Sequence, residues 1–211
     1  MEIIKSNIMR FNRFVSVILI IIGISIMDSL SQNIIIDSQM TFEEAIKGTK
    51  APKDVILNLV LLDVVYYSVD DKLHRGQLII HKDVKEDIEE IFRLILQNKF
   101  PIMKVVPIVK YKWSDNASME DNNTSAFNYR NIAGTKRLSN HSFGKAVDIN
   151  PFFNPVIHKD GSASPKSAKY DTSKPGTFYQ SHFIVQEFLK RGWRWGGTFS
   201  SYADNHHFDK P

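Results

Sequence analysis

Two short polar motifs, far apart in the chain, constrain the fold more than any other feature of the sequence. The first runs from Ser139 to Asp148 and the second from Asp204 to His207. Between them they supply two imidazoles and one carboxylate that could bind one zinc ion: His141, His207 and Asp148. Three protein ligands leave a fourth tetrahedral position for water, as in catalytic zinc sites. We therefore expect a fold that brings these three side chains together.

The spacing within the first motif predicts a bend followed by a strand. His141 and Asp148 are too far apart for neighbouring turns of a helix, and the glycine between them is unfavourable to a continuous one. A bend at His141 and a short strand over 146–149 would bring both side chains to one point. Apolar neighbours surround Asp148, so its charge needs a partner. That partner is a metal ion or, alternatively, Arg130 or Arg137 in a structural salt bridge.

The second motif adds a candidate acid and base. Asp204 and His207 are three residues apart, so both can face one site. With His207 as the third ligand, Asp204 lies close to the zinc-bound water, where a carboxylate acts as general base and then as general acid for the leaving amine. Phe208 could shield the ion. We assign His206, a competing ligand, to structure or substrate contact, because it would place Asp204 only two residues away.

Both motifs resemble those of a known family, the zinc peptidases of bacterial cell-wall peptides. It includes VanY-type D-alanyl-D-alanine carboxypeptidases and L-alanyl-D-glutamate endopeptidases. Residues 139–151 resemble its His/Asp zinc motif and 204–208 its closing motif, and the similarity extends from about Gln77 to Phe208. The resemblance covers most of the chain after its first segment.

The resemblance implies roles for individual residues. His141, Asp148 and His207 would bind Zn²⁺, and Asp204 would be the catalytic acid/base. Many carboxypeptidase members carry glutamate at this last position. Aspartate is more like the endopeptidase branch, so the resemblance leaves the cleaved bond open.

Three further residues are candidate substrate contacts. The family has an arginine after an aromatic-containing strand, and the resemblance implies that Arg130 binds a substrate carboxylate or the oxyanion. Alternatively, Arg130 forms an ion pair with an acidic loop residue. Arg137 lies in what we interpret as a solvated turn. Ser139 is expected to bond the loop backbone or a ligand carboxylate, and Trp195 to be core or pocket wall.

The first 31 residues predict export. A basic start is followed by an apolar run from Phe14 to Met27. This run fits a secretory signal better than the ~20 residues of a membrane-spanning helix. An uncleaved N-terminal anchor is the alternative. Both place the remaining zinc peptidase domain, residues 32–211, outside the cytoplasm of a bacterium: periplasmic, in the cell envelope or secreted.

Composition restricts the partners. The chain has no cysteine, so an exported domain must rely on core packing and the metal rather than on disulfides. Its formal net charge of +4 is mild, and no basic stripe with interleaved aromatics supports nucleic acid binding. We expect a monomer that acts on peptidoglycan peptides and contacts the membrane only through an uncleaved N-terminal segment.

Hydrophobic patterning predicts an α+β single domain, with a small, mostly antiparallel sheet flanked by helices and the zinc site at the sheet. In the first half we expect a short helix opened by Thr41, a hairpin over 55–81, a helix begun by an Asp83–Glu86 capping box and a strand over 102–109. After it we expect a loop over 113–125, a loop over 158–177 that forms a flap or rim beside the site, a helix capped by Ser181 and a strand over 193–197.

These observations favour an exported zinc metallopeptidase that hydrolyses peptide bonds in peptidoglycan stem peptides, as a carboxypeptidase or an endopeptidase. The alternative is an exported zinc-containing cell-wall binding module without catalytic activity. Asp204 discriminates between them, because a binding module needs no carboxylate beside the third ligand. In a third alternative, the histidines and aspartates satisfy one another without metal.

Overall fold

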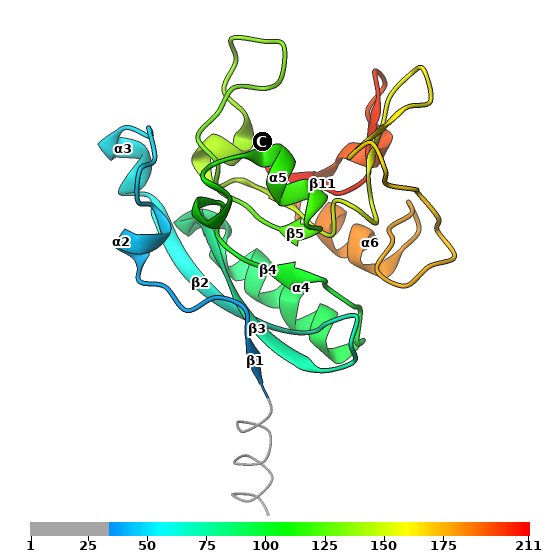
Figure 1. The fold of residues 1–211 in the computed structure, drawn as a ribbon, viewed down its shortest axis with the longest axis horizontal. Coiled ribbons are helices and arrows are strands. Elements are labelled where there is room, and N and C mark those ends of the chain that lie inside the picture. Colours follow the sequence, from blue (N-terminus) through cyan, green and yellow to red (C-terminus); the bar gives the residue numbers. More distant parts are fainter. Residues whose placement is uncertain (1–33) are drawn as a thin grey trace, which may run out of the picture. The chain divides into compact units, whose positions relative to one another are not determined.

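The computed structural model describes residues 34–211 (Figure 1). The predicted signal peptide or anchor, residues 1–31, lies outside this range. Within the described part of the chain, no helix has the length and apolar character needed to cross a bilayer.

A long hairpin forms the first half of the domain. Strands β2 (Leu59–Tyr67) and β3 (Leu73–His81) pair antiparallel over their full length, as predicted for this region. The short β1 (Ile35–Ile36) adds parallel to β3. Strand β2 begins later than its apolar pattern indicates, because residues after Pro52 first form the short helix α3 (Lys53–Ile56). The helix predicted at Thr41 is α2 (Phe42–Ala45), with its capping box formed.

Helix α4 (Lys85–Gln97) packs on this hairpin (Figure 1). Its buried residues follow the predicted apolar stripe: Ile88, Ile91, Phe92 and Ile95. The start of the helix differs from the prediction. The 3₁₀ turn η1 (Lys82–Val84) comes first, and the His81 ring caps it by accepting from the Asp83 backbone N–H. The predicted Asp83–Glu86 capping box is therefore wrong, although the helix itself is confirmed.

The segment between α4 and the first motif is less extended than expected. Only β4 (Lys104–Val105) is a strand within 102–109, and it pairs parallel with β5 (Asn123–Thr124). Pro107 then begins the 3₁₀ turn η2 (Ile108–Tyr111). The predicted loop over 113–125 contains α5 (Asp115–Glu120), because the Ser114 hydroxyl caps it by accepting from the Ala117 N–H.

A second sheet carries the two motifs. Strand β11 (His207–Asp209) lies between β6 (Ala146–Asp148) and β9 (Arg194–Trp195), antiparallel to both. Helix α6 (Phe183–Lys190) covers it, and Phe188 stacks on Phe208 with ring centroids 4.0 Å apart. The predicted cap of this helix is wrong: the His182 ring, not Ser181, accepts from the Ile184 N–H.

Short elements complete the domain. Strand β7 (Val156–Ile157) lies between β10 (Ala203–Asp204) and β8 (Ala163–Ser164), and 3₁₀ turns occur at η3 (Asn140–Phe143) and η4 (Gly196–Thr198). Apart from β8, residues 158–177 are irregular, as predicted. The hairpin, α4, α6 and the second sheet share one apolar core. This is the predicted single α+β domain with small, mostly antiparallel sheets.

Candidate metal centre

Strand pairing brings two of the predicted ligands face to face. In the antiparallel register of β6 and β11, His207 lies directly opposite Asp148. Directly opposed residues point to the same face of a sheet. The His207 Nδ1 atom is 2.9 Å from Asp148 Oδ1. On its other side Asp148 pairs with Ser125, so the backbone of this aspartate is fixed from both edges.

The third ligand comes from the bend before β6. Turn η3 begins at Ser139, whose hydroxyl accepts from the His141 N–H, and ends at Gly144 in the left-handed conformation. A Cβ on Gly144 would lie 2.6 Å from the backbone nitrogen of His81, so the turn sits directly against β3. His141 Nε2 lies 3.1 Å from Asp148 Oδ2 and 3.2 Å from His207 Nδ1.

The donor atoms fit a zinc ion. The two imidazole nitrogens are 3.2 Å apart, and the Asp148 carboxylate contacts His207 Nδ1 through Oδ1 at 2.9 Å and His141 Nε2 through Oδ2 at 3.1 Å. A tetrahedral ion with ~2.0–2.1 Å bonds keeps its ligand atoms roughly 3.3 Å apart. Within residues 34–211, His141, Asp148 and His207 form the group of acidic and histidine side chains with metal-binding spacing. Two imidazole nitrogens and one carboxylate oxygen are a donor set typical of catalytic zinc.

Neighbouring groups fix which nitrogen each histidine offers. His141 Nδ1 donates to the carbonyl oxygen of Ala126, which leaves Nε2 for the centre. His207 Nε2 faces Asp209 Oδ2 at 3.8 Å, which leaves Nδ1. Asp209 accepts in turn from Arg194 Nε at 2.9 Å and from Asn140 Nδ2 at 2.7 Å.

The sequence interpretation missed both of these supporting groups. His207 and Asp209 are two residues apart in one strand, so they share a face, and this spacing was an available signal. The carbonyl of Ala126 gives no signal in a sequence, because every residue has one.

The electrostatics of the centre are dominated by burial and by close opposite charges. Burial alone would raise the pKa of Asp148, but His141 and His206, with hydrogen bonds from His141 and His207, hold it well below its usual range. Burial alone would lower the pKa of His207, whereas the hydrogen bond with Asp148 and the nearby Asp209 carboxylate raise it to about 10. Since a metal ligand must be the deprotonated imidazole, an ion bound at this candidate site would displace a proton from His207.

Asp204 stands at the edge of this centre. It ends β10, and its Oδ1 atom is buried and lies 3.0 Å from His206 Nε2, without the alignment of a hydrogen bond. Gly196 lies beneath it. A Cβ on Gly196 would come within 2.5 Å of the Asp204 carbonyl oxygen and 3.2 Å of the His207 Cβ. The glycine thus allows turn η4 to pack against both residues.

Arg130 forms an ion pair with an acidic residue. Its guanidinium is 2.8 Å from Asp115 Oδ2, and both side chains are 30 % exposed. Its Nε atom is buried without a hydrogen-bond partner in the described residues. Asp148 is not paired with Arg130 or Arg137, so the salt-bridge alternative for that aspartate is not what the fold adopts.

Both arginines act electrostatically on Tyr202, near Asp204. Burial raises the pKa of the Tyr202 hydroxyl and the charge of Asp204 raises it further, whereas Arg137 and Arg130 oppose this. The positive charges therefore lie within electrostatic reach of the residues that flank the centre.

The other two candidate substrate contacts have structural partners. Ser139 is 5 % exposed and caps the turn that carries His141. Trp195 is 4 % exposed, packs in the core and donates its indole N–H to the Asn205 carbonyl at 2.9 Å. The sequence left core and pocket wall as alternatives for Trp195, and the structure places it in the core. A substrate contact by Ser139 or Trp195 stays a prediction.

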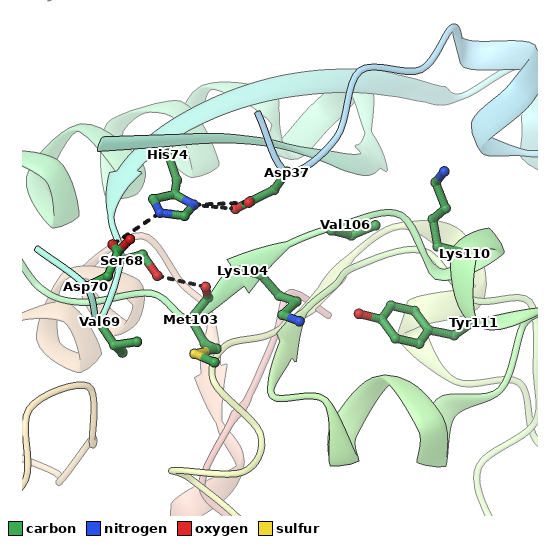
Figure 2. Close-up of a pocket in the computed structure, with 10 residues that line it drawn as sticks. All are labelled: Asp37, Ser68, Val69, Asp70, His74, Met103, Lys104, Val106, Lys110 and Tyr111. Carbon is green, nitrogen blue, oxygen red and sulfur yellow. Dashed lines mark hydrogen bonds and ion pairs between the residues drawn. The ribbon is translucent and has the colours of Figure 1, made fainter. Parts of the chain in front are cut away.

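A cavity of about 520 Å³ lies on another part of the domain (Figure 2). Figure 2 shows His74 between Asp37 and Asp70. The Nδ1 atom of His74 is 3.0 Å from the Asp37 carboxylate, and its Nε2 atom is 3.2 Å from Asp70 Oδ1. Asp37 follows β1, so these bonds tie the start of the domain to the hairpin. None of the candidate ligands lines this cavity.

Comparison with known families agrees with the motifs. A family model described as D-alanyl-D-alanine carboxypeptidase matches residues 133–210, which include all three candidate ligands and Asp204. Comparisons with curated proteins and with solved structures found no match. The match supports the family prediction: residues 133–210 are similar to D-alanyl-D-alanine carboxypeptidases.

Proposed function

We propose that this protein is a zinc-dependent peptidase that hydrolyses peptide bonds in peptidoglycan stem peptides outside the cytoplasm. The observation that carries the proposal is the cluster of two imidazoles and one carboxylate, whose groups contact one another at 2.9, 3.1 and 3.2 Å, with a second carboxylate three residues from His207. The family match over the same residues supports it.

The ligands would be His141 through Nε2, His207 through Nδ1 and Asp148 through its carboxylate. When bound, zinc polarises a peptide carbonyl and makes water a stronger acid. The protein's own contribution is rigidity. The cross-strand pair and the backbone bond of His141 Nδ1 hold the donors in place before any ligand arrives.

Asp204 is the proposed general base and acid. Its side chain is 16 % exposed, and its Oδ2 atom makes no hydrogen bond or ion pair with residues 34–211. The carboxylate takes a proton as a water oxygen attacks the carbonyl carbon. It then passes that proton to the departing nitrogen as the carbon–nitrogen bond breaks, and the products are a carboxylate and an amine.

Arg130 is the proposed partner of negative charge on the substrate. Its pair with Asp115 is 30 % exposed on both sides, so the pair is open to exchange with a substrate carboxylate or a developing oxyanion. A fixed guanidinium provides planar, bidentate hydrogen bonding for either group. Loss of one such donor can lower the rate by ~10²–10³.

Two bonds are candidates for cleavage. The matched family is described by D-alanyl-D-alanine cleavage, whereas aspartate at position 204 resembles the endopeptidase branch. Digestion of purified peptidoglycan, with mass spectrometry of the products, separates them. A carboxypeptidase releases free alanine from pentapeptide stems, and an endopeptidase releases a stem fragment that begins at glutamate.

The decisive controls use the metal and Asp204. We expect a chelator to abolish hydrolysis and added zinc to restore it. Asp204→Asn should keep one zinc per chain and lose turnover. Asp54→Asn, at an exposed carboxylate on α3, should behave as the wild type. Hydrolysis that continues in chelator, or a wild-type protein without stoichiometric zinc, would contradict the proposal.

A further inference from the structure

His206 is buried beside the metal centre but is not one of its ligands. It is 3 % exposed, and its Nδ1 atom lies 2.7 Å from the carbonyl oxygen of Asn154. A carbonyl oxygen can only accept a hydrogen bond, so Nδ1 carries a proton and donates to it, whereas Nε2 can donate to a carboxylate only when it carries a proton as well. This contact sets the orientation of the ring. The other nitrogen, Nε2, then lies 3.0 Å from Asp204 Oδ1 and 4.0 Å from Asp148 Oδ2.

The group that orients this ring is itself rigid. Asn154 is fully buried, and its side-chain amide donates to the carbonyls of Ile149 and Gly176 while its Oδ1 accepts from the Phe178 N–H. The backbone carbonyl of His206 accepts from the Ile149 N–H at 3.0 Å. His206 is therefore held from two sides by the segment that directly follows Asp148.

The two oxygens of Asp204 have different surroundings. Oδ1 is buried, and its one polar neighbour at ion-pair distance in the described residues is His206 Nε2. Oδ2 has no such neighbour in the described residues, and the side chain as a whole is 16 % exposed. The Nε2–Oδ1 distance is that of a hydrogen bond, although its angle is not. Hydrogen bonds in active sites are often poorly aligned before substrate binds and tighten in the complex.

We propose that His206 is a positioning residue, which holds Asp204 by Oδ1 so that Oδ2 faces the reacting water and the leaving amine. The inference rests on the proposed function, because it assigns a purpose to the carboxylate of Asp204. It goes beyond the sequence interpretation, in which His206 was left to structure or substrate contact. The ring acts through Asp204 and touches neither substrate nor metal.

Two substitutions separate positioning from a purely structural role. The side-chain nitrogen of asparagine stands about where Nδ1 of histidine lies, and that of glutamine about where Nε2 lies. His206→Asn therefore keeps the bond to the Asn154 carbonyl and loses the contact with Asp204. His206→Gln keeps the contact with Asp204 and loses the bond to Asn154.

If His206 positions Asp204, His206→Asn lowers kcat by ~10–100-fold, as is typical for residues that orient a metal centre, with KM and zinc content unchanged. His206→Gln rescues at least a third of kcat, even with a lower Tm. A structural role predicts the reverse order, because only the Asn154 bond anchors the fold. Crystal structures of both metal-free variants give a second readout: the Asp204 side chain keeps its torsion in His206→Gln and rotates in His206→Asn.

Each outcome decides the matter. Wild-type activity in His206→Asn overturns the positioning role, as does a tenfold loss in His206→Gln with zinc retained. If His206→Asn does not fold, His206→Gln decides alone, because it keeps only the Asp204 contact. A wild-type protein that binds zinc but cleaves no stem peptide would instead contradict the proposed function. In that case the Asp204 torsions in the two variants still test the contact.

Discussion

Two parts of this domain are stabilised in different ways. We call the part built on β2, β3 and α4 the hairpin half, and the part that holds His141, Asp148 and His207 the metal-centre half. Strands β2 and β3 have nine residues each, and α4 packs on them through a continuous apolar stripe. The strands around the metal centre have two or three residues. Their connections rely on buried asparagines, such as Asn123, Asn150 and Asn154, whose side chains bond to backbone groups.

This difference shows how the protein combines stability with a fixed site. Apolar burial stabilises the hairpin half without demanding exact partners, since hydrophobic contacts are not directional. Hydrogen bonds are directional, so the asparagine network sets the position of loops that regular structure does not reach. We expect substitutions in the first half to act on stability and those in the second to act mainly on metal binding and turnover.

The largest effect is expected at a ligand. Asp148→Asn removes the negative donor between two histidines, so zinc content should fall from one per chain to near zero and hydrolysis to background. Metal analysis of the purified protein and a peptidase assay measure both. A variant that retained stoichiometric zinc would break the comparison, because the centre would then not depend on the carboxylate of Asp148.

A core substitution in the hairpin half should show the opposite pattern. Ile88 is fully buried in α4, so Ile88→Ala should lower the free energy of unfolding by about 2–5 kcal/mol. Urea unfolding measures this, with Leu57→Ala at an exposed position as the control. Zinc content and kcat of the folded fraction should match the wild type. Loss of zinc by the folded variant would show that the two halves are coupled.

The residue behind His207 sharpens the contrast within the metal-centre half. Asp209→Asn weakens the partner that orients the imidazole, and zinc affinity should fall by ~10–100-fold. Competition with a chelator of known affinity measures it. The change also affects the half-exposed Arg194 pair. Arg194→Gln is therefore the matched control, and its zinc affinity should stay closer to that of the wild type.

The smallest effect is expected at the edge of the hairpin half. Thr41→Ala removes the hydroxyl that caps α2 and should cost about 1 kcal/mol of stability. Thermal unfolding would record the shift, while zinc binding and turnover stay unchanged. A change in zinc affinity would show that this distant helix influences the centre.

Local patterns were enough for the regular part of the fold. The apolar stripe of α4, the turn residues between the two β-prone runs of the hairpin and the capping box at Thr41 each act between residues close in sequence. Predictions failed where two local patterns competed. Asp83 with Glu86 has the letters of a capping box, but the neighbouring His81 ring reaches the same backbone. Ser181 likewise gave way to His182 as the cap of α6.

The side chains able to form the centre can be named from the two motifs, because zinc chemistry limits ligands to a few residue types. How these side chains meet depends on the fold. The β6–β11 register, the Ala126 carbonyl behind His141 and the ring of His206 beside Asp204 all join segments distant in the chain. Such contacts follow from packing and backbone hydrogen bonds, which every residue can make and no single residue type announces.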